Sequence, residues 1–462
     1  MTTTPVSDAA NAFQAHLAAA STEIPAHLPG TEGYESGRFA WNAAADQRPA
    51  VVALPRSADE VSAVVRAAAA AGLRVRVQST GHAASALSRA DLSDVVLVNL
   101  RDFSGVTIDE ETRVARILGG TLWQDVVAAA APHGLTALHG SAGDVAAIGY
   151  LLNGGLSFYA RRHGLAINSV RAVEIVLADG SIVRASGTQN TSLFWAARGG
   201  AGAIGVVTAV EIDLLPYPDV IAGMLLWDAA RAAEVVRAYR DWTLTAPASA
   251  TTSLRIMHFP PLPELPPFLS GRSVVVIDGA ILDDDQGGAL ELEPLRALTP
   301  EMDTFGRMPS AGLLGVHMDP PVPTPSVSDH AIIETLPDAG VEAFLAASGV
   351  ESGLMFAELR QLGGAVGRSP EHGGALAAVP GSFALYAIAV APFPEAVEAG
   401  RAATARVVEA LAPYAADRLL PTFAERADGR EAKYGEHSSR LSEEARRFDP
   451  HGTFISVHQI RA

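Results

Sequence analysis

The stretch that most constrains the fold runs from Arg76 to Ala83 and reads Arg-Val-Gln-Ser-Thr-Gly-His-Ala. It continues an alternating apolar run, Leu73–Val77, which predicts a strand. Before that run, Ser57 is the expected N-cap of a helix and Glu60 its capping-box partner. The polar loop after the strand offers hydroxyls and open backbone N–H groups, which suit a pyrophosphate. On its own the loop, which ends at His82, is equally typical of a solvated turn.

Composition limits the class of protein. At 462 residues the chain is too long for one simple core, so we expect two domains. A net charge of −17 argues against nucleic acid or an anionic membrane as partner. The absence of cysteine excludes disulfides, thiolate nucleophiles and cysteine metal sites. With no secretory pattern in residues 1–20 and no apolar run of about 20 residues, the sequence predicts a soluble cytoplasmic protein.

Strands and helices alternate in the first half, which predicts an α+β domain with mixed sheets. A helix is expected from Thr121, as N-cap with Gln124 as capping-box partner, to about Ala131. The remaining elements are strands at 51–54, 94–98, 114–118 and 206–214, a hairpin at 173–184 with an Asp-Gly turn, and a helix at 192–197.

A second glycine-rich segment, 139–155, mixes small and apolar residues without a clear period. We interpret it as a long ordered loop, in which glycine lets the backbone approach a flat or charged ligand. The Gly-x-Gly-x-x-Gly motif is absent, which disfavours a nicotinamide-binding Rossmann fold.

Residues 217–414 differ in character, because long strands alternate with fewer helices. Strands are predicted at 221–227, 253–258, 273–281, 354–359 and 383–390, and helices near 229–243, 337–347 and 394–413. This pattern indicates an antiparallel sheet covered on one face. The proline-rich stretches 260–267 and 320–325 are expected to be surface loops that border a substrate entrance.

Several motifs occur in the order of one known family. They are Gln78–His82, the loop Gly140–Gly155, Arg162-x-Gly-Leu, Val176-x-Ala-Asp-Gly, Leu193–Gly200 through Thr208, Tyr434-Gly with Arg440-Leu, and Phe448-Asp-Pro. Together they cover about residues 45–216 and 415–462. The chain resembles the FAD-linked oxidases of the vanillyl-alcohol-oxidase superfamily, in their berberine-bridge-enzyme-like branch.

The resemblance implies an α+β fold with a two-subdomain FAD-binding domain of the PCMH type and an inserted antiparallel-sheet substrate domain. The main part of the FAD domain would span 1–216, the substrate domain 217–414, and a C-terminal segment, 415–462, would return to the FAD domain. By resemblance, the cofactor-binding residues are Gln78, Ser79, Thr80, Gly81, His82, Ala83, Gly140, Ser141, Asp144, Val145, Gly149, Asn153, Gly154, Gly155, Gly205, Val206, Val207, Tyr434, His437 and His458.

In such enzymes the histidine that matches His82 is commonly bonded covalently to the flavin. Many relatives add a cysteine bond, but here Ala142 occupies that place, so the resemblance implies FAD linked through His82 only. Val145 matches a position that admits oxygen, which implies an oxidase that makes hydrogen peroxide.

Substrate oxidation also needs a base for the O–H or N–H proton. The candidates are Tyr386, Glu358 and, in the C-terminal segment, Tyr434; His258 and His317 are further candidates. Each is equally typical of packing or of an internal ion pair. Relatives often carry a tyrosine where this chain has Leu420, so that base cannot be carried over.

The leading hypothesis is an FAD-dependent oxidase that takes a hydride from a small alcohol, sugar, amine or phenolic compound and reduces O2. The alternatives are a dehydrogenase of the same fold with another electron acceptor, and a flavin- or sugar-binding protein without turnover. The histidines lack the spacing of a metal hydrolase. Substrate identity and oligomeric state stay open.

Overall fold

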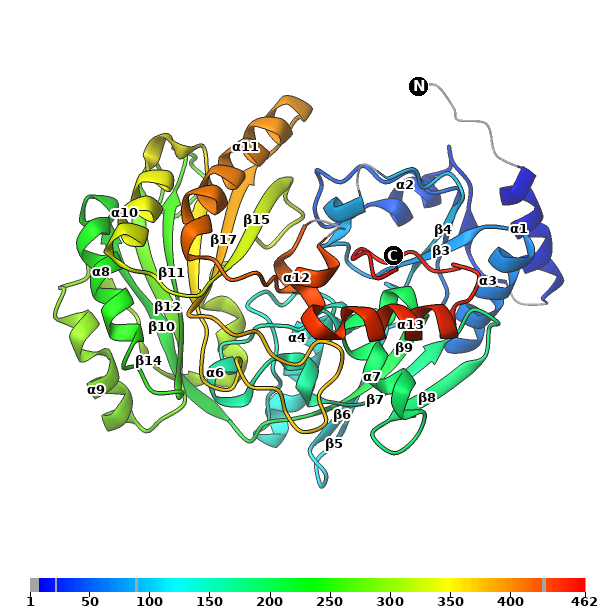
Figure 1. The fold of residues 1–462 in the computed structure, drawn as a ribbon, viewed down its shortest axis with the longest axis horizontal. Helices are drawn as coiled ribbons and strands as arrows, with labels where there is room; N and C mark the ends of the chain where they lie inside the picture. The colour runs from blue at the N-terminus through cyan, green and yellow to red at the C-terminus, as the bar shows by residue number, and fades with distance from the viewer. Residues whose placement is uncertain (1–7, 21–22, 88–89, 426–428, 462) are drawn as a thin grey trace.

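The computed structural model describes residues 8–20, 23–87, 90–425 and 429–461. Three β-sheets organise them, of four, five and eight strands. Figure 1 shows the eight-stranded sheet with its helices as one half of the molecule and the two smaller sheets in the other half. The α+β fold class is confirmed.

The four-stranded sheet carries the opening stretch. Its order is β1 (Ala26–His27), β2 (Val51–Ala53), β4 (Val95–Asn99) and β3 (Arg74–Gln78), with β2, β4 and β3 parallel. Helices α1 (Asp8–Ala19), α2 (Glu32–Arg38) and α3 (Ala58–Ala70) flank it. Ser57 is the N-cap of α3, as predicted, and accepts from the Glu60 N–H. The reciprocal half of the capping box is wrong, since the Glu60 carboxylate accepts from the N–H of Arg56 instead.

The five-stranded sheet is antiparallel, in the order β5 (Val106–Asp109), β6 (Val114–Leu118), β9 (Val206–Asp213), β7 (Val170–Val176) and β8 (Ile182–Ser186). The predicted hairpin is confirmed as β7–β8, and Gly180 takes the positive φ of +81° that its turn requires. Helices α4 (Trp123–Ala130), α5 (Ala147–Leu152) and α7 (Thr191–Gly200) contact this sheet. Helix α13 (Ser438–Phe448) contacts α7, α12 (Arg430–Tyr434) contacts α13, and α6 (Ala160–His163) contacts the large sheet described below.

Two local predictions in this region are wrong. Thr121 does not cap α4, whose N-cap is Leu122, because its hydroxyl is bonded to the backbone of Gly105 across the loop. The segment 139–155 is not a continuous loop, because its second half forms α5. The buried residues of α5 are Ala147, Ile148, Leu151 and Leu152, and a helix of six residues is too short to show a clear helical period in the sequence.

The large sheet is antiparallel, in the order β13 (Met302–Asp303), β10 (Asp219–Asp228), β12 (Ser273–Ile281), β11 (Ala250–His258), β16 (Phe356–Gln361), β17 (Phe383–Val390) and β15 (Ser326–Ile333), with β14 (Gly306–Pro309) also paired to β10. Helices α8 (Ala232–Thr243), α10 (Asp338–Ala347) and α11 (Pro394–Leu411) pack over one face, and α9 (Asp285–Arg296) lies beside α8. The expected antiparallel sheet with one covered face is confirmed.

The chain returns to the first half through its C-terminal segment. Helix α13 packs on α7, and Phe454 forms a parallel bridge with Val75 at the edge of β3. The break between β9 and β10 and this return support our proposed division at about residues 216 and 414.

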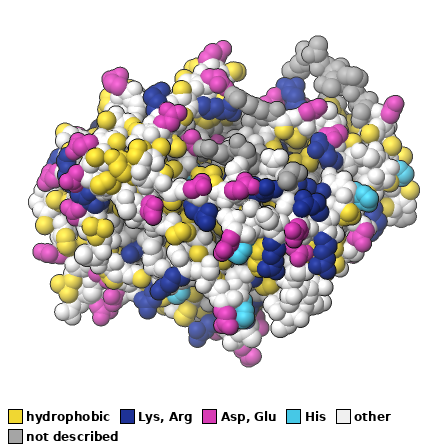
Figure 2. Space-filling view, in the orientation of Figure 1, with side chains coloured by type: hydrophobic (Ala, Val, Ile, Leu, Met, Phe, Trp, Pro, Cys, Tyr) yellow, Lys and Arg dark blue, Asp and Glu magenta, His cyan; other side chains and the backbone are white. Residues whose placement is uncertain are grey.

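The surface shows no concentration of one charge on the visible face, where basic and acidic side chains are interspersed (Figure 2). Within the described residues, no helix has the length and hydropathy that a membrane span requires. The same residues contain no cluster of three or more His, Asp or Glu side chains placed to hold a metal ion.

Candidate active site

A cavity of about 870 Å³ is lined by residues of all three sheets. The loop after β3 and the second glycine-rich segment line it from one half of the molecule. The uncovered face of the large sheet lines it from the other half, together with the loops around 259–269, 317–326 and 421–425. Both proline-rich stretches predicted to border the site do line this cavity.

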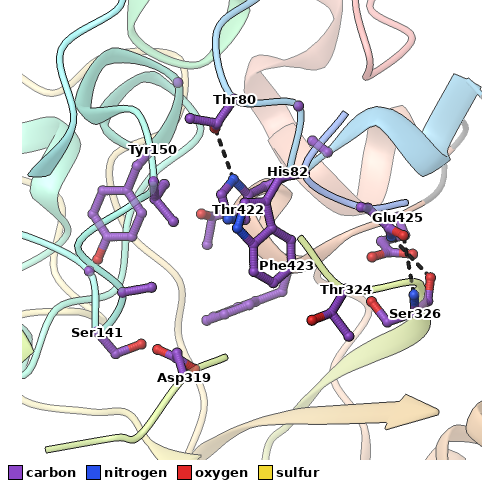
Figure 3. A pocket seen from close by; sticks show the side chains of 18 of the residues that line it. Thr80, His82, Ser141, Tyr150, Asp319, Thr324, Ser326, Thr422, Phe423 and Glu425 are labelled. Atoms are coloured by element: carbon purple, nitrogen blue, oxygen red, sulfur yellow. Dashed lines mark hydrogen bonds between the residues drawn. The ribbon is translucent and has the colours of Figure 1, made fainter. Parts of the chain in front are cut away.

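The loop after β3 is held by backbone contacts that glycine permits. Gly81 has a φ of +84°, and a Cβ there would lie 2.9 Å from the Cα of Ala40. The Ser79 hydroxyl donates to the carbonyl of Gly119, at a distance of 2.8 Å. The loop therefore has a fixed shape, in which His82 faces the cavity (Figure 3).

The imidazole of His82 is stacked and neutral. Its Nδ1 lies 2.8 Å from the Thr80 hydroxyl, and its ring stacks on Trp41 at 4.3 Å between centroids. Burial lowers the pKa of His82 to about 4, although the Asp319 carboxylate acts in the opposite direction. The Nε2 atom has no hydrogen-bond partner among the described residues, and the nearest carboxylate oxygen, on Asp144, is 3.9 Å away. A neutral ring with one unengaged nitrogen is a competent nucleophile.

Arg76 supplies a buried cation at the same site, which the sequence reading did not single out. It lies on β3 with 3% of its surface exposed and lines the cavity. Its Nε and one terminal nitrogen have no partner among the described residues. Burial lowers the pKa of Arg76 to about 10, so the guanidinium still carries its charge at neutral pH. A buried, unpaired cation beside a glycine loop fits an anionic group such as a pyrophosphate.

The second glycine-rich segment contributes the wall opposite. Its cavity-lining residues include Gly140, Ser141, Val145 and Gly149. The Tyr150 hydroxyl is buried beside them without a partner in the described part of the chain. The donor set of the two loops therefore leaves polar atoms for a ligand, and it fits the predicted FAD.

Most of the predicted cofactor residues line the cavity. They are Gln78, Ser79, Thr80, Gly81, His82, Ala83, Gly140, Ser141, Val145, Gly149, Asn153, Gly205, Val207 and His458. Their role in binding FAD stays a proposal.

Six predicted cofactor residues lie outside the lining, and each has another evident role. Asp144 accepts a hydrogen bond from the indole of Trp41, which holds the ring that stacks on His82. Gly154 and Gly155 have positive φ values and make room for neighbouring side chains. Val206 packs in the core of the four-stranded sheet. The ring of His437 packs edge-on against Trp195.

Tyr434, the sixth of these residues, was also a catalytic candidate. Its ring is buried in the core beside the five-stranded sheet, and its hydroxyl donates to the carbonyl of Gly199 at 2.9 Å. Burial also raises the pKa of Tyr434. Tyr434 does not line the cavity and its hydroxyl is engaged with Gly199, so its catalytic role stays a prediction without support from this geometry.

A polar stripe borders the cavity, which we define as Arg255, Asp278, His317, Glu358 and Arg360. His317 comes from a loop and the others from the large sheet, and all but Asp278, which lies fully buried behind them, line the cavity. Register places Arg255 opposite Glu358, and Glu358 opposite the candidate Tyr386. The guanidinium Nε of Arg360 donates to Glu358 at 2.8 Å. His317 lies 2.9 Å from Asp278 through Nδ1 and 3.2 Å from Arg360 through Nε2. Because an ionised carboxylate only accepts, Nδ1 of His317 donates to Asp278.

Glu358 and Tyr386 both line the cavity, as the sequence prediction requires, but their states differ. Burial raises the pKa of the Glu358 carboxyl, and the Arg360 cation and His317 outweigh it, so the net effect is a lowered pKa. Glu358 is therefore an ionised, engaged member of an ion pair. The pKa of Tyr386 is raised, mainly by burial and then by the nearby Glu425 carboxyl. Tyr386 therefore stays protonated and donates.

Glu425 is the titratable group that the sequence reading missed. It lines the cavity two residues after Phe423 (Figure 3). The ring of Phe423 lies 5.0 Å from that of Tyr386. The Glu425 carboxylate accepts from the backbone N–H of Ser328 at 3.3 Å. Burial raises the pKa of Glu425 to about 7, although hydrogen bonds from Ser85 and Ser328 act against it. No signal in the sequence placed this loop residue beside Tyr386.

The other candidates are engaged elsewhere. His258 lies outside the cavity lining, with Nδ1 bonded to Ser273 and Nε2 to the carbonyl of Ser348. Leu420, which stands where relatives often carry a tyrosine, is fully buried, and its N–H bonds to His330. Of the catalytic candidates, Tyr386, Glu358 and His317 line the cavity, and Glu425 joins them. The Asp319 carboxylate also lines it, and its Oδ2 has no partner among the described residues.

Comparison with known proteins supports this reading. Residues 49–186 match the family described as an FAD binding domain. Glucooligosaccharide oxidase from Sarocladium strictum is 31% identical over 53% of this chain and 50% of its own length. (R)-6-hydroxynicotine oxidase from Paenarthrobacter nicotinovorans is 34% identical over 43% of each chain. The matched region thus spans about half the length of these curated relatives or less.

Solved structures extend the likeness of fold to nearly the whole chain. A variant of BBE-like 1 from Physcomitrella patens superposes with a TM-score of 0.84 at 20% identity, covering 97% of this chain and 98% of its own. Glucooligosaccharide oxidase from Acremonium strictum, whose FAD is 6-S-cysteinyl and 8α-N1-histidyl, gives 0.82 at 21% identity, covering 98% and 99%. Residues 49–186 therefore match an FAD binding domain, and nearly the whole chain has the fold of the BBE-like and glucooligosaccharide oxidase structures.

Proposed function

We propose that the protein is an FAD-dependent oxidase that takes a hydride from a small organic substrate and reduces O2 to H2O2. One observation carries the proposal. The loop with His82, the buried Arg76 and the acid–base groups Tyr386 and Glu425 all line the same cavity. A site for a flavin and a site for a substrate would therefore be continuous.

The residues that would hold FAD are those of the two glycine-rich loops and Arg76. Arg76 and the Ser79–Gly81 backbone would bind the pyrophosphate, and the unengaged Nε2 of His82 would form the covalent bond. A second bond through cysteine is excluded, because the chain has no cysteine, so the covalent linkage that we propose would be single. When bound, FAD would supply the hydride acceptor and pass two electrons on to O2.

Glu425 is the residue that we assign as the proton acceptor. A pKa of about 7 leaves its carboxylate available near neutral pH and basic enough to take an O–H or N–H proton. Tyr386, which stays protonated, would donate a hydrogen bond to the same substrate atom. Glu358 is a weaker base than Glu425, because the Arg360 cation stabilises its ionised form. The role that we assign to Glu358 is to position Arg360 and the other side chains of the polar stripe.

The overall reaction balances with O2 as the oxidant. The substrate loses a hydride from its C–H bond and a proton from its O–H or N–H group, which gives a carbonyl or imine. The two electrons and two protons leave with O2 as H2O2. Val145 lines the cavity, which supports access of oxygen at this wall. A dehydrogenase of the same fold with another acceptor is the alternative.

Two measurements on the purified protein test the proposal without a known substrate. After acid precipitation, yellow colour that stays with the pellet indicates covalent FAD, and His82→Ala should release that colour into the supernatant. The flavin is then reduced anaerobically with dithionite and mixed with O2. Rapid reoxidation with one H2O2 per flavin is the expected result. Slow reoxidation in O2 together with fast reoxidation by a quinone would favour the dehydrogenase. A protein that binds no FAD would overturn the proposal and the reading of Arg76 with it.

A further inference from the structure

Beside the polar stripe, the uncovered face of the large sheet is apolar. We define the apolar chamber as Met224, Leu226, Met257, Val276 and Phe356, all of which line the cavity. Register makes them neighbours, since Leu226 pairs with Val276 on β12, and Met257 pairs with Phe356 on β16. Their side chains share one face because residues two apart in a strand point the same way.

A loop covers this chamber with further apolar side chains. Phe259, Leu265, Phe268 and Leu269 line the same cavity, and both phenylalanines pack against the chamber residues. The loop is closed at its base by backbone bonds, from Phe259 to the carbonyl of Arg272 and from Gly271 to that of Pro260. The chamber is thus enclosed by aliphatic and aromatic groups on two sides.

The polar stripe offers few spare partners to a ligand. Asp278 accepts from Arg255 and His317, and Glu358 accepts from Arg360 and Ser253. The stripe is thus largely paired within itself, and Nε of Arg255 and Oδ1 of Asp278 are its buried atoms without a partner among the described residues. Tyr386 and Glu425, at the other side of the stripe, face the cavity, as does Asp319, whose Oδ2 has no partner among the described residues.

The two regions are close enough for one small molecule to reach both. The rings of Phe356, in the chamber, and Tyr386 lie 6.4 Å apart. This distance is within the range over which two aromatic rings contact each other. A molecule seated in the chamber therefore places a polar substituent beside Tyr386 and Glu425.

These surfaces discriminate between substrate classes. An oligosaccharide would bury several hydroxyls against the chamber, and each unpaired one costs about 1–3 kcal/mol. An apolar ring gains about 25 cal/mol for each Å² that it buries there. The names of the relatives do not decide the class, because they include both oligosaccharide and hydroxynicotine oxidases.

We propose that the substrate has a compact apolar ring as its body and a single hydroxyl or amine as its reacting group, and that it is not an oligosaccharide. The body lies in the apolar chamber and the polar group faces Tyr386 and Glu425. This inference rests on the proposed function, because it takes the cavity as the oxidase site.

The test is equilibrium binding to the oxidised holoenzyme, followed by the change in flavin absorption. The probes are 4-methoxybenzyl alcohol and cellobiose. We expect the aryl alcohol to bind at least about tenfold more tightly than cellobiose. Met224→Gln, in the chamber, should weaken the aryl alcohol about tenfold, which corresponds to about 1.4 kcal/mol. Leu226→Gln tests a second wall of the chamber in the same way, and Leu244→Gln, at a leucine that is 75% exposed, is the matched control.

Three results would overturn the inference. They are tighter binding of cellobiose, no binding of the aryl alcohol up to its solubility, or equal aryl-alcohol affinity in the chamber variants and Leu244→Gln. If Leu226→Gln does not fold, the aryl-alcohol affinity of Met224→Gln, a change at a half-buried position, decides whether the inference holds. The proposed function is tested separately, since a holoenzyme that is reoxidised rapidly by O2 and prefers cellobiose overturns the substrate class alone.

Discussion

At the scale of single residues, Glu425 gives a prediction that needs no substrate. Its pKa rises from an ordinary 4.5 to about 7 on folding, so the folded protein holds this proton more tightly than the unfolded chain. The resulting stability is present below about pH 4.5 and is lost as pH rises through 7. Glu425→Gln keeps the shape without the charge. We expect it to raise the melting temperature at pH 8, with an increase of about 1–3 kcal/mol in the free energy of unfolding. At pH 4 we expect no change in the melting temperature.

The control is Glu264→Gln, which removes an exposed carboxylate at the rim of the same cavity. It should not change the melting temperature at either pH. The catalytic half of the assignment is tested by anaerobic flavin reduction with the aryl alcohol. The wild-type rate should increase through about pH 7, and Glu425→Gln should lose about 10²–10⁴-fold and this pH dependence. A rate in Glu425→Gln that still increases through pH 7 would assign the base elsewhere.

Gly155 gives a second prediction at this scale. Its φ is +66°, and a Cβ there would overlap the Tyr150 ring and lie 2.8 Å from the Cβ of Ala166. Gly155→Ala should therefore lower the free energy of unfolding by about 1–3 kcal/mol and displace Tyr150 from the cavity wall. Gly187→Ala is the matched control, since nothing lies within 4 Å of its added methyl. Thermal melts of the two variants compare them, and equal melting temperatures would contradict the prediction.

At the scale of elements, the polar stripe predicts a non-additive pair. Arg360→Met leaves the Glu358 carboxylate, which is 1% exposed, without its cation. Breaking a buried pair from one side costs about 3–5 kcal/mol. Adding Glu358→Gln removes the stranded charge, so the double variant should recover a substantial part of that loss. The free energies of unfolding of the four proteins form the cycle that measures it, and additive losses would mean that the pair is not coupled.

The elements that could be predicted from the sequence are those whose side chains alternate cleanly. The strands β10, β11, β12 and β17 were found because their helix-covered face is continuously apolar. Strand β15 was missed, because Ser326, Ser328 and His330 interrupt the apolar pattern on its other face. Helix α9 was missed because it contains two glycines and Pro294, and it begins only through the Asp284 cap, which accepts from Gly287.

In the site, too, the residues that could be predicted are those set by local sequence requirements, and those that could not depend on tertiary packing. His82 and the glycine loops could be located, because a tight turn and close backbone approach impose local sequence requirements. Arg76 reads as an ordinary strand residue, and Glu425 as an ordinary loop residue. Their importance comes from burial at one cavity, which brings together segments about 350 residues apart in the sequence. Tyr434 illustrates the converse, since a match to a family position did not indicate that its ring packs in the core and that its hydroxyl bonds to Gly199.

At the scale of the whole molecule, separate cores meet at one cavity. The helix-covered face of the large sheet forms one hydrophobic cluster, and the two smaller sheets centre on two others. The cavity lies where these units face one another, and its lining comes from each of them. A ligand that fills it would therefore stabilise the arrangement of the units as well as its own binding loops.

This arrangement predicts how loss of FAD affects stability. In His82→Ala, FAD would be exchangeable, so added FAD should raise the melting temperature by mass action. At 100 times its dissociation constant, FAD should add about 2.7 kcal/mol to the free energy of unfolding. Adding Arg76→Leu removes the buried cation that we assign to the pyrophosphate. A hydrogen bond to a charged group contributes about 1.5–3 kcal/mol, so FAD affinity should fall about 10–100-fold. Without FAD, the same variant should melt no lower than His82→Ala, because burying an unpaired charge is unfavourable.

The matched control is Arg48→Leu in the same background, since the Arg48 side chain is 73% exposed and pairs only at the surface with Asp46. Titration of FAD, followed by flavin fluorescence and by thermal melts, separates binding from folding. Arg76→Lys keeps a charge without the fork of donors and should bind FAD with an intermediate affinity. If Arg76→Leu instead binds FAD as tightly as the Arg48→Leu control, the unpaired guanidinium is not the anion site. The cofactor would then be held by the loop backbone alone, and the stabilisation on adding FAD would not depend on β3.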